Sequence, residues 1–457
     1  MSEDYYKALG ETRPSCRDEH SLKKGKGMEQ IPEQPIVKAD LEPEFAAFVA
    51  IDWADQKHYW SLKVAGQQAL QRGNLDSTPE AVEVWIMELH LRFAGRPLAV
   101  ALEQRRGALA VILSKYAHVH LYPVHPTTLA KFREAWYPSR SKSDPVDADL
   151  LLEILTAHRS RLRRLDPDTV EMRLVQTLVE NRRKLVDERT ALSNRLTDLL
   201  KLYFPQILGW FDEVTSAVVG DLLEQWPSLQ ELQQAKPAKL EKFLRTHHCL
   251  EIPERLNQIR QAIPATFDRA LMDSAPFLVA AWVRQIAVLR DSIRQLEKHI
   301  AELAAKQEDW PIFQSFPGAG AALAPRLMAA LGTQRYRYAS ANELHCFSGI
   351  APVKEASGNT EWVHFRRACP KFLRQTFHEW AGCSIAQCEW AKAYYQQQKA
   401  RGKKHHAAVR SLAFKWMRIL YRCWKDRQPY REEIYLTSLA KRRSALVAVL
   451  AKAVQMP

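Results

Sequence analysis

The alternation of hydrophobic and polar positions between residues 45 and 124 predicts a mixed α/β domain. Patterns typical of β-strands recur along this stretch, at 47–53, 58–64, 69–75, 96–103 and 118–124. Short turns join the first three, and helical patterns at 78–93 and 107–117 separate the later ones. Three strands joined by turns, followed by strands alternating with helices, indicate a mixed sheet covered by helices.

A different pattern begins at Thr169, where apolar residues recur at heptad spacing. Leucines lie seven residues apart at 178, 185, 192 and 199. A second seam has the spacing 4-3-4-3-4-3, through Trp282, Ile286, Leu289, Ile293, Leu296, Ile300 and Leu303. This a/d spacing predicts coiled-coil helices. We predict that they dimerise the protein, and the alternative is a hairpin of two helices within one chain.

These patterns divide the chain into five parts. We predict a flexible polar arm over 1–44, an α/β domain over 45–165, a helical region over 166–309, a C-terminal domain over 310–440 and a tail over 441–457. The fold class is therefore α/β plus all-α. Within the helical region, five prolines between residues 205 and 275 indicate shorter helices.

The charge of the chain favours a polyanionic partner. The net charge is +14, and the stretch Pro352–Arg427 carries sixteen Lys/Arg against five Asp/Glu, a surplus of eleven. Such a basic segment is typical of nucleic-acid binding, and the alternative is a solvated helical surface.

The remaining composition points to the inside of a cell. No apolar run reaches the ~18 residues of a membrane span, and the N-terminus lacks the apolar core of a secretory signal. The seven cysteines show no C-x-x-C spacing, so we expect reduced thiols and no zinc site. We expect a cytoplasmic protein associated with the nucleoid.

Four carboxylates form a candidate metal set. Asp52 follows the apolar run "FVAI", and Glu103 closes the strand "AVAL". In "SDPVDADLL", Pro145 fits the first helical position, which makes Asp144 the N-cap and places Asp147 on the same helix face. Carboxylates converging at a sheet can hold two Mg²⁺ ions ~4 Å apart that clamp a phosphodiester. Alternatively, Asp144 and Asp147 only cap a helix, Glu103 is a surface residue and Asp52 is a satisfied core carboxylate.

The basic C-terminal stretch contains candidate groups for nucleic-acid binding. The sequence "FPGAGAALAPRL", with Gly318 and Gly320, resembles a helix-hairpin-helix whose turn offers N–H groups to a phosphate; an ordinary helical hairpin looks similar. Basic candidates follow it, at Arg366, Arg367, Lys371, Arg374, Lys403 and Lys404. Ser357 lies in a polar segment before these residues, whereas Ser348 lies in the semi-apolar "CFSGIAP" and is predicted to be structural. Cations near a serine would stabilise a phosphate that its hydroxyl attacks.

The chain resembles transposases of the insertion-sequence 110 family. The resemblance lies in "AIDWADQKH", "ALEQRRG", "KSDPVDADLL", "FPGAG" and "FSGIAP" with a downstream "SG", and covers about 46–160 and 310–425. It implies an RNase H-like (RuvC-like) nuclease domain, a coiled coil and a C-terminal transposase domain. The stretch 205–275 and the N-terminal arm depart from the family pattern.

The resemblance also implies a mechanism. Asp52, Glu103, Asp144 and Asp147 would bind Mg²⁺, and Ser357 would form a covalent phosphoserine link to DNA. Donor and target DNA, a non-coding guide ("bridge") RNA and a dimer of dimers would be the partners. Two other functions stay open from the residues alone: an RNase H-like nuclease that uses water, and a non-catalytic nucleic-acid-binding scaffold.

Overall fold

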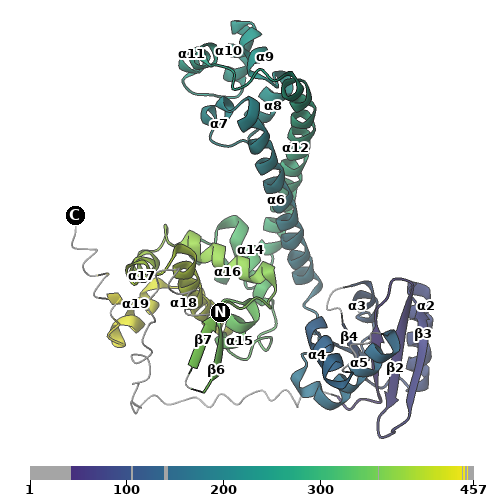
Figure 1. Cartoon of the computed structure of the whole chain (residues 1–457). Coiled ribbons are helices and arrows are strands. Elements are labelled where there is room, and N and C mark those ends of the chain that lie inside the picture. The colour runs from purple at the N-terminus through teal and green to yellow at the C-terminus, as the bar shows by residue number, and fades with distance from the viewer. Residues whose placement is uncertain are drawn as a thin grey trace. The chain divides into compact units, whose positions relative to one another are not determined.

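The computed structural model describes residues 43–103, 107–137, 143–358, 360–444, 446–447 and 450 (Figure 1). They form two compact units, which meet in the sequence between Asp168 and Thr169. The predicted boundary after residue 165 falls three residues before this division. The predicted boundary after residue 309 falls within the second unit, where a new helix begins at Trp310. Nearly all of the predicted arm and part of the predicted tail lie outside the described residues.

The first unit is a five-stranded mixed sheet with helices. Its elements are β1 (Ala47–Asp52), β2 (Lys57–Val64), β3 (Leu70–Asp76), α2 (Pro79–Arg92), β4 (Leu98–Leu102), α3 (Ala108–Leu113), β5 (Val119–Pro123), α4 (Pro126–Trp136), α5 (Asp144–His158) and a 3-10 turn (Arg159–Arg161). The strand order is β3-β2-β1-β4-β5. β1 pairs antiparallel with β2 and parallel with β4, which confirms the predicted mixed sheet.

The two central strands are apolar because helices cover both of their faces. Val49 and Ile51 pack in a core with residues of α2 and α3. The alternate residue Ala50 packs with Ala99 and Ala101 of β4 in a second core, together with leucines of α4 and α5. Small alanines on this face let α5 approach the sheet closely. Position along β1 and β4 therefore decides which helix a side chain meets.

The second unit is almost entirely helical. It consists of α6 (Val170–Tyr203), α7 (Gln206–Trp210), α8 (Ala217–Gln225), α9 (Leu229–Gln234), α10 (Pro237–Thr246), α11 (Ile252–Gln261), α12 (Arg269–Ala305), α13 (Trp310–Gln314), α14 (Gly320–Leu331), α15 (Ala341–Ser348), β6 (Val353–Ser357), β7 (Thr360–His364), α16 (Lys371–Ser384), α17 (Glu389–Ala400), α18 (His405–Asp426) and α19 (Glu432–Lys441). The predicted shorter helices between 205 and 275 are α7 to α11, which pack on the ends of α6 and α12.

The long helices α6 and α12 pair with each other as an antiparallel hairpin (Figure 1). Of the predicted seam, Ile286, Ile293 and Ile300 are buried and the other four positions are half-buried. An ion pair between Arg182 of α6 and Glu297 of α12, at 2.9 Å, joins the two helices. The apolar seam of α12 is therefore covered by α6 of the same chain, as in the alternative of a helical hairpin within one chain. Dimerisation stays a prediction, and it requires a different surface.

Contrary to the expectation from sequence, one described helix is long and apolar enough to cross a membrane by those two measures. This helix is α12, with a mean hydropathy of 1.2 over 18 residues. A core helix of a soluble protein can have the same length and hydropathy. Because α12 packs along α6 and against α8, we assign it to the helical hairpin.

Tryptophans form the centre of the C-terminal core. Trp380, Trp390, Trp416 and Trp424 are fully buried, and their indole N–H groups have acceptors. For example, Trp416 donates to Ser384 Oγ at 2.8 Å. The first turns of α6 enter the same core through Met172, Val175 and Val179. The α6–α12 hairpin is thus anchored in the body that carries the C-terminal helices.

We expect Ile293→Asp to destabilise the second unit by more than about 3 kcal/mol, because it buries a charge between α6 and α12. Urea unfolding followed by circular dichroism measures this loss. Val288→Asp, on the exposed face of α12, is the control and should change stability by less than about 0.5 kcal/mol. A midpoint that rises with protein concentration would contradict pairing within one chain.

Candidate active site

Asp52 and Glu103 lie at the same edge of the sheet. Because Ile51 pairs with Leu102 between parallel strands, the next residues are Asp52 at the end of β1 and Glu103 directly after β4. Neighbouring strands are about 4.8 Å apart. Alternation along β1 puts Asp52 on the face of Ala50, and Glu103 continues the alternation of Ala99 and Ala101. Asp52 is 6% exposed and Glu103 is half-buried.

Helix α5 covers this face and is fixed to it by Asp149. Ser61 of β2 donates to Asp149 Oδ1 at 2.6 Å, and Arg72 of β3 donates to both carboxylate oxygens at 2.9–3.1 Å. Asp149 is therefore a structural residue that holds α5 across two strands. The interaction with Asp149 raises the pKa of Arg72, which stays charged. Asp149 is thus engaged by β2 and β3 rather than by the predicted metal set.

The start of α5 differs by one residue from the prediction. Ser143 is the N-cap residue, and Asp144 is the first helical residue. Proline is tolerated throughout a first helical turn, so Pro145 fits the second position equally well. Asp144 is exposed, whereas Asp147 is 1% exposed. The two carboxylates share a helix face but have different environments.

Asp147 is held by an arginine that sequence reasoning missed. Arg133 of α4 donates two bonds to its carboxylate, Nε to Oδ1 and Nη2 to Oδ2, both at 2.6 Å. Such a bidentate pair is among the stronger interactions of a carboxylate. No pattern in the sequence marks Arg133, because one arginine on a short amphipathic helix looks like a surface residue.

The predicted metal set therefore has suitable chemistry but is not gathered into one cluster. All four side chains offer the hard oxygen atoms that Mg²⁺ prefers. Among the residues that the structure describes, no three acidic, histidine or cysteine side chains converge as a metal site. Arg133 therefore competes with any ion that Asp147 would bind together with Asp52 and Glu103. The six described cysteines are all free thiols.

The structure separates the two candidate serines clearly. Ser348 is fully buried, and its hydroxyl donates to the His345 carbonyl at 3.2 Å, as expected of a structural residue. Ser357 is exposed and ends β6, opposite Thr360 of β7. The polar segment that holds Ser357 is thus a β-hairpin, with the ion pairs Lys354–Glu361 and His364–Glu355 across its strands. Ser357 stands at its tip, before Gly358, whose φ is +56°.

The two glycines of the predicted helix-hairpin-helix turn have different surroundings. Gly318 is buried against the backbone of Ser384, where a Cβ would lie 2.5 Å from a nitrogen. Its N–H donates to Gln387 Oε1 at 2.9 Å, so this glycine packs the turn on α16. Gly320 is exposed at the start of α14. A phosphate contact stays a prediction, with Gly320 the better-placed glycine.

The predicted basic residues also divide into two kinds. Arg366 donates to the Ala351 carbonyl at 3.2 Å and reaches the Pro352 carbonyl, so it fixes the start of the hairpin. Four others are exposed, namely Arg367, Lys371, Lys403 and Lys404. Arg374 is half-buried and donates to the Arg366 carbonyl. Arg366 therefore has a structural task that its charge alone did not reveal.

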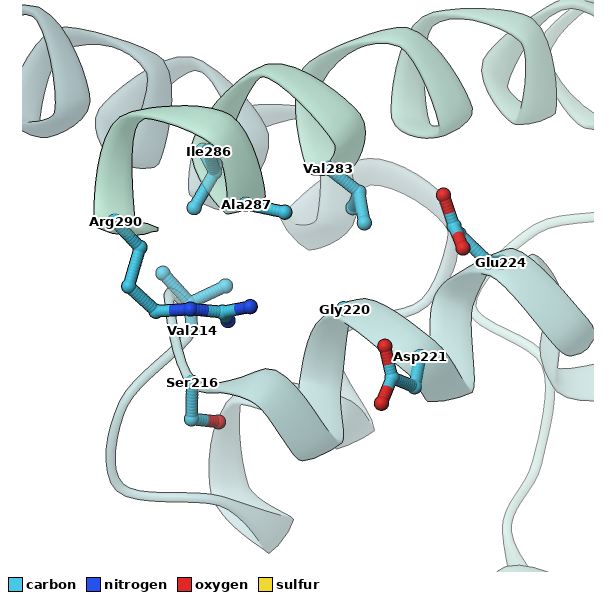
Figure 2. A pocket seen from close by; sticks show the side chains of 9 residues that line it. All are labelled: Val214, Ser216, Gly220, Asp221, Glu224, Val283, Ile286, Ala287 and Arg290. Carbon is cyan, nitrogen blue, oxygen red and sulfur yellow. The ribbon is translucent and has the colours of Figure 1, made fainter. Parts of the chain in front are cut away.

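A small cavity between α8 and α12 does not belong to this site (Figure 2). Its volume is about 40 Å³, and Arg290 reaches toward it from α12. Gly220 allows the close approach of α8, because a Cβ there would lie 3.3 Å from Val283. This volume suits water but is too small for a nucleotide.

The chain was compared with known protein families and curated proteins. Residues 49–205 match a family model described as a transposase, and residues 311–396 match one described as transposases of the IS116/IS110/IS902 family. The first segment contains all four predicted metal ligands, and the second contains Ser357.

Curated relatives cover most of the chain. The mini-circle putative transposase for IS117 of Streptomyces coelicolor is 26% identical over 402 residues, which is 86% of this chain and 97% of the relative. An insertion element IS110 protein of 43.6 kDa from the same organism is 23% identical, covering 84% of this chain and 95% of its own length. The transposase for insertion sequence element IS1111A of Coxiella burnetii is 25% identical over about half of each chain. This chain therefore belongs to the insertion-sequence 110 family of transposases.

Proposed function

We propose that this transposase cuts and rejoins DNA by transesterification, with an acidic edge in the first unit and a serine in the second. Asp52, Glu103, Asp144 and Asp147 would form its acidic edge, and Ser357 would be its nucleophile. The observation that carries the proposal is the position of Asp52, a buried carboxylate that ends a central apolar strand beside Glu103. Burying a carboxylate costs several kcal/mol unless it is paired, hydrogen-bonded or bound to metal. Two carboxylates that end neighbouring parallel strands offer hard oxygen ligands at one edge of the sheet.

The acidic edge would hold a divalent cation, for which Mg²⁺ is our proposal. A bound ion would neutralise charge on the phosphate and on the attacking oxygen. The task of the protein is to hold the oxygen ligands and to keep α5 in place, which the bonds of Asp149 to Ser61 and Arg72 accomplish. Arg133 would keep the buried Asp147 satisfied when no ion is bound.

Ser357 would carry the covalent step. Its Oγ attacks the phosphorus, the Oγ–P bond forms and the P–O3′ bond breaks, which leaves a 5′-phosphoserine and a free 3′-hydroxyl. The hydroxyl proton leaves to a base, for which the carboxylates of the acidic edge are the candidates. A 3′-hydroxyl of the partner strand then attacks the phosphoserine and restores the serine. The bond energy is conserved, which agrees with a sequence that lacks a G-x-x-x-x-G-K-[ST] motif.

The partners we propose are donor and target DNA, a guide RNA and further copies of this chain. The basic surplus of Pro352–Arg427 supports a nucleic-acid partner. For assembly, exposed apolar residues are present at the end of the α6–α12 hairpin away from α14, namely Leu250, Ile263, Phe267 and Phe277. Ser357 would act with the acidic edge of its own chain or with that of a second copy. We place this reaction in the cytoplasm. Sequencing the RNA that copurifies with the protein tests the guide.

We expect Asp52→Asn to lower strand joining by more than about 100-fold while the protein stays folded. Asparagine keeps the size of the side chain but removes the charge that the site needs. Joining of labelled DNA in Mg²⁺ is the measurement. Asp55→Asn, three residues on and exposed, is the matched control and should join DNA at the wild-type rate. Near wild-type joining by Asp52→Asn would show that this carboxylate is only a core residue.

Arg133→Met should destabilise the first unit by about 3 kcal/mol in EDTA, because it leaves Asp147 buried without its partner. If Asp147 is a metal ligand, millimolar Mg²⁺ should restore part of this loss and should stabilise the variant more than the wild type. Thermal unfolding measures both effects. Lys131→Met, on the exposed face of α4, is the control. An equal response of variant and wild type to Mg²⁺ would remove Asp147 from the metal set.

Ser357→Ala should abolish the covalent protein–DNA adduct but keep DNA binding within about twofold, because only the attacking hydroxyl is lost. A denaturing gel of labelled DNA incubated with the protein and Mg²⁺ detects the adduct. Ser348→Ala should keep the adduct and at most lower stability, since it removes a buried hydrogen bond. An adduct that persists in Ser357→Ala would refute the assignment. DNA nicking without an adduct in the wild type would show that water is the nucleophile.

A further inference from the structure

An open pocket lies at the base of the β6–β7 hairpin, between the hairpin, α16 and α18. Its volume is about 310 Å³, at the lower end of the range for small-ligand sites. Phe365 lines it directly after β7, Lys371, Arg374 and His378 line it from α16, and Arg410 lines it from α18. The labels β6, β7, α16 and α18 mark these elements in Figure 1.

Two guanidinium groups are held together on one aromatic ring in this pocket. The Cζ atom of Arg374 lies 4.6 Å from the ring centre of Phe365, and that of Arg410 lies 5.2 Å from it. Burial, and then the nearby charge of Arg374, lower the pKa of Arg410, although an arginine stays charged at neutral pH. Like charges held so close repel each other. An anion bound between them would relieve that repulsion.

The part of the chain that the structure describes supplies no acidic partner to this pair. Among the described residues, no carboxylate lies within ion-pair distance of Arg374 or Arg410. The one acid that lines the pocket, Glu379, is already engaged by Arg326 at 2.6 Å and by Arg183 at 3.1 Å. The positive charge of the pocket is therefore available to a ligand.

The start of α16 reinforces the preference for an anion. Its first turn carries Lys371 and Arg374 and no acidic residue, although the positive end of the helix dipole disfavours cations there. Burial lowers the pKa of His378 further along this helix, so the positive charge of the pocket comes from Lys371, Arg374 and Arg410. The pocket thus gathers three cationic side chains from two helices, as phosphate sites do.

We propose that this pocket binds a backbone phosphate of the DNA, separate from the phosphate that Ser357 would attack. Ser357 stands at the tip of the hairpin, opposite Thr360. Phe365 follows Thr360 by five residues, which corresponds to about 17 Å along β7. At about 3.4 Å per nucleotide step, this span equals about five nucleotides of a duplex strand. Arg410 is then a positioning residue that sets how DNA passes the hairpin. This role rests on the proposed DNA-joining function.

The test is the salt dependence of DNA binding by the full chain, measured by fluorescence anisotropy in EDTA. The probe is a fluorescein-labelled single-stranded DNA of about 20 nucleotides. Arg410→Gln should weaken binding about tenfold at low salt. It should also lower the slope of log K against log salt by about 0.7, which is the share of one phosphate contact on a single strand. Arg410→Lys should keep the slope because the charge remains.

The matched control is Arg422→Gln, on the same helix, whose guanidinium is exposed and paired with Asp426. It should leave affinity and slope unchanged. An unchanged slope for Arg410→Gln would overturn the proposal, and so would a change seen only with an RNA of the same sequence. Because binding is measured without metal or joining, Ser357→Ala should retain the wild-type slope. The phosphate site and the serine mechanism can therefore fail independently.

Discussion

The geometry of the acidic edge depends on how α5 is fixed to the sheet. Asp149 accepts bonds from Ser61 and Arg72, on two different strands, and thereby sets both the position and the rotation of the helix. Residues 147 and 149 lie about 200° apart around a helix, so holding Asp149 toward β2 and β3 turns Asp147 away from them and toward Arg133 of α4. One exposed-rim ion pair would contribute little. A bidentate pair supported by a hydroxyl resists rotation, which matters more here than its free energy.

The same edge places opposing demands on its carboxylates. Burial of Asp52 and Asp147 makes any cation at this position interact strongly with them, since little water screens the charges. Burial also penalises each carboxylate when no cation is present. For Asp147, the two short hydrogen bonds from Arg133 offset this cost. In an acidic site that includes Asp147, a metal ion and Arg133 therefore compete for the same carboxylate, and the difference between two large interaction energies sets the affinity for the ion.

The first unit could be predicted from sequence because its strands follow strong rules. Apolar runs bounded by turns located β1 to β5 within one or two residues, and the helical pattern at 78–93 located α2 within one residue at each end. The hairpin with Ser357 was missed because β6 and β7 face solvent and show no apolar alternation; charge pairs across the strands hold them. The partner of the α12 seam was beyond prediction, since heptad spacing specifies a partner helix without saying which chain supplies it. Arg133 and Arg410 became visible only when helices distant in sequence came together.

The exposed β6–β7 hairpin also has a consequence for how this protein can change over evolution. Four of the five residues in β6 and all five in β7 are exposed, and none belongs to the tryptophan-centred core. Substitutions on the hairpin therefore cost little folding stability, and selection there acts on what the hairpin touches rather than on whether the protein folds. The body that carries it is tightly packed and tolerates far less. A projection that lies outside the core can therefore change in sequence while the fold persists.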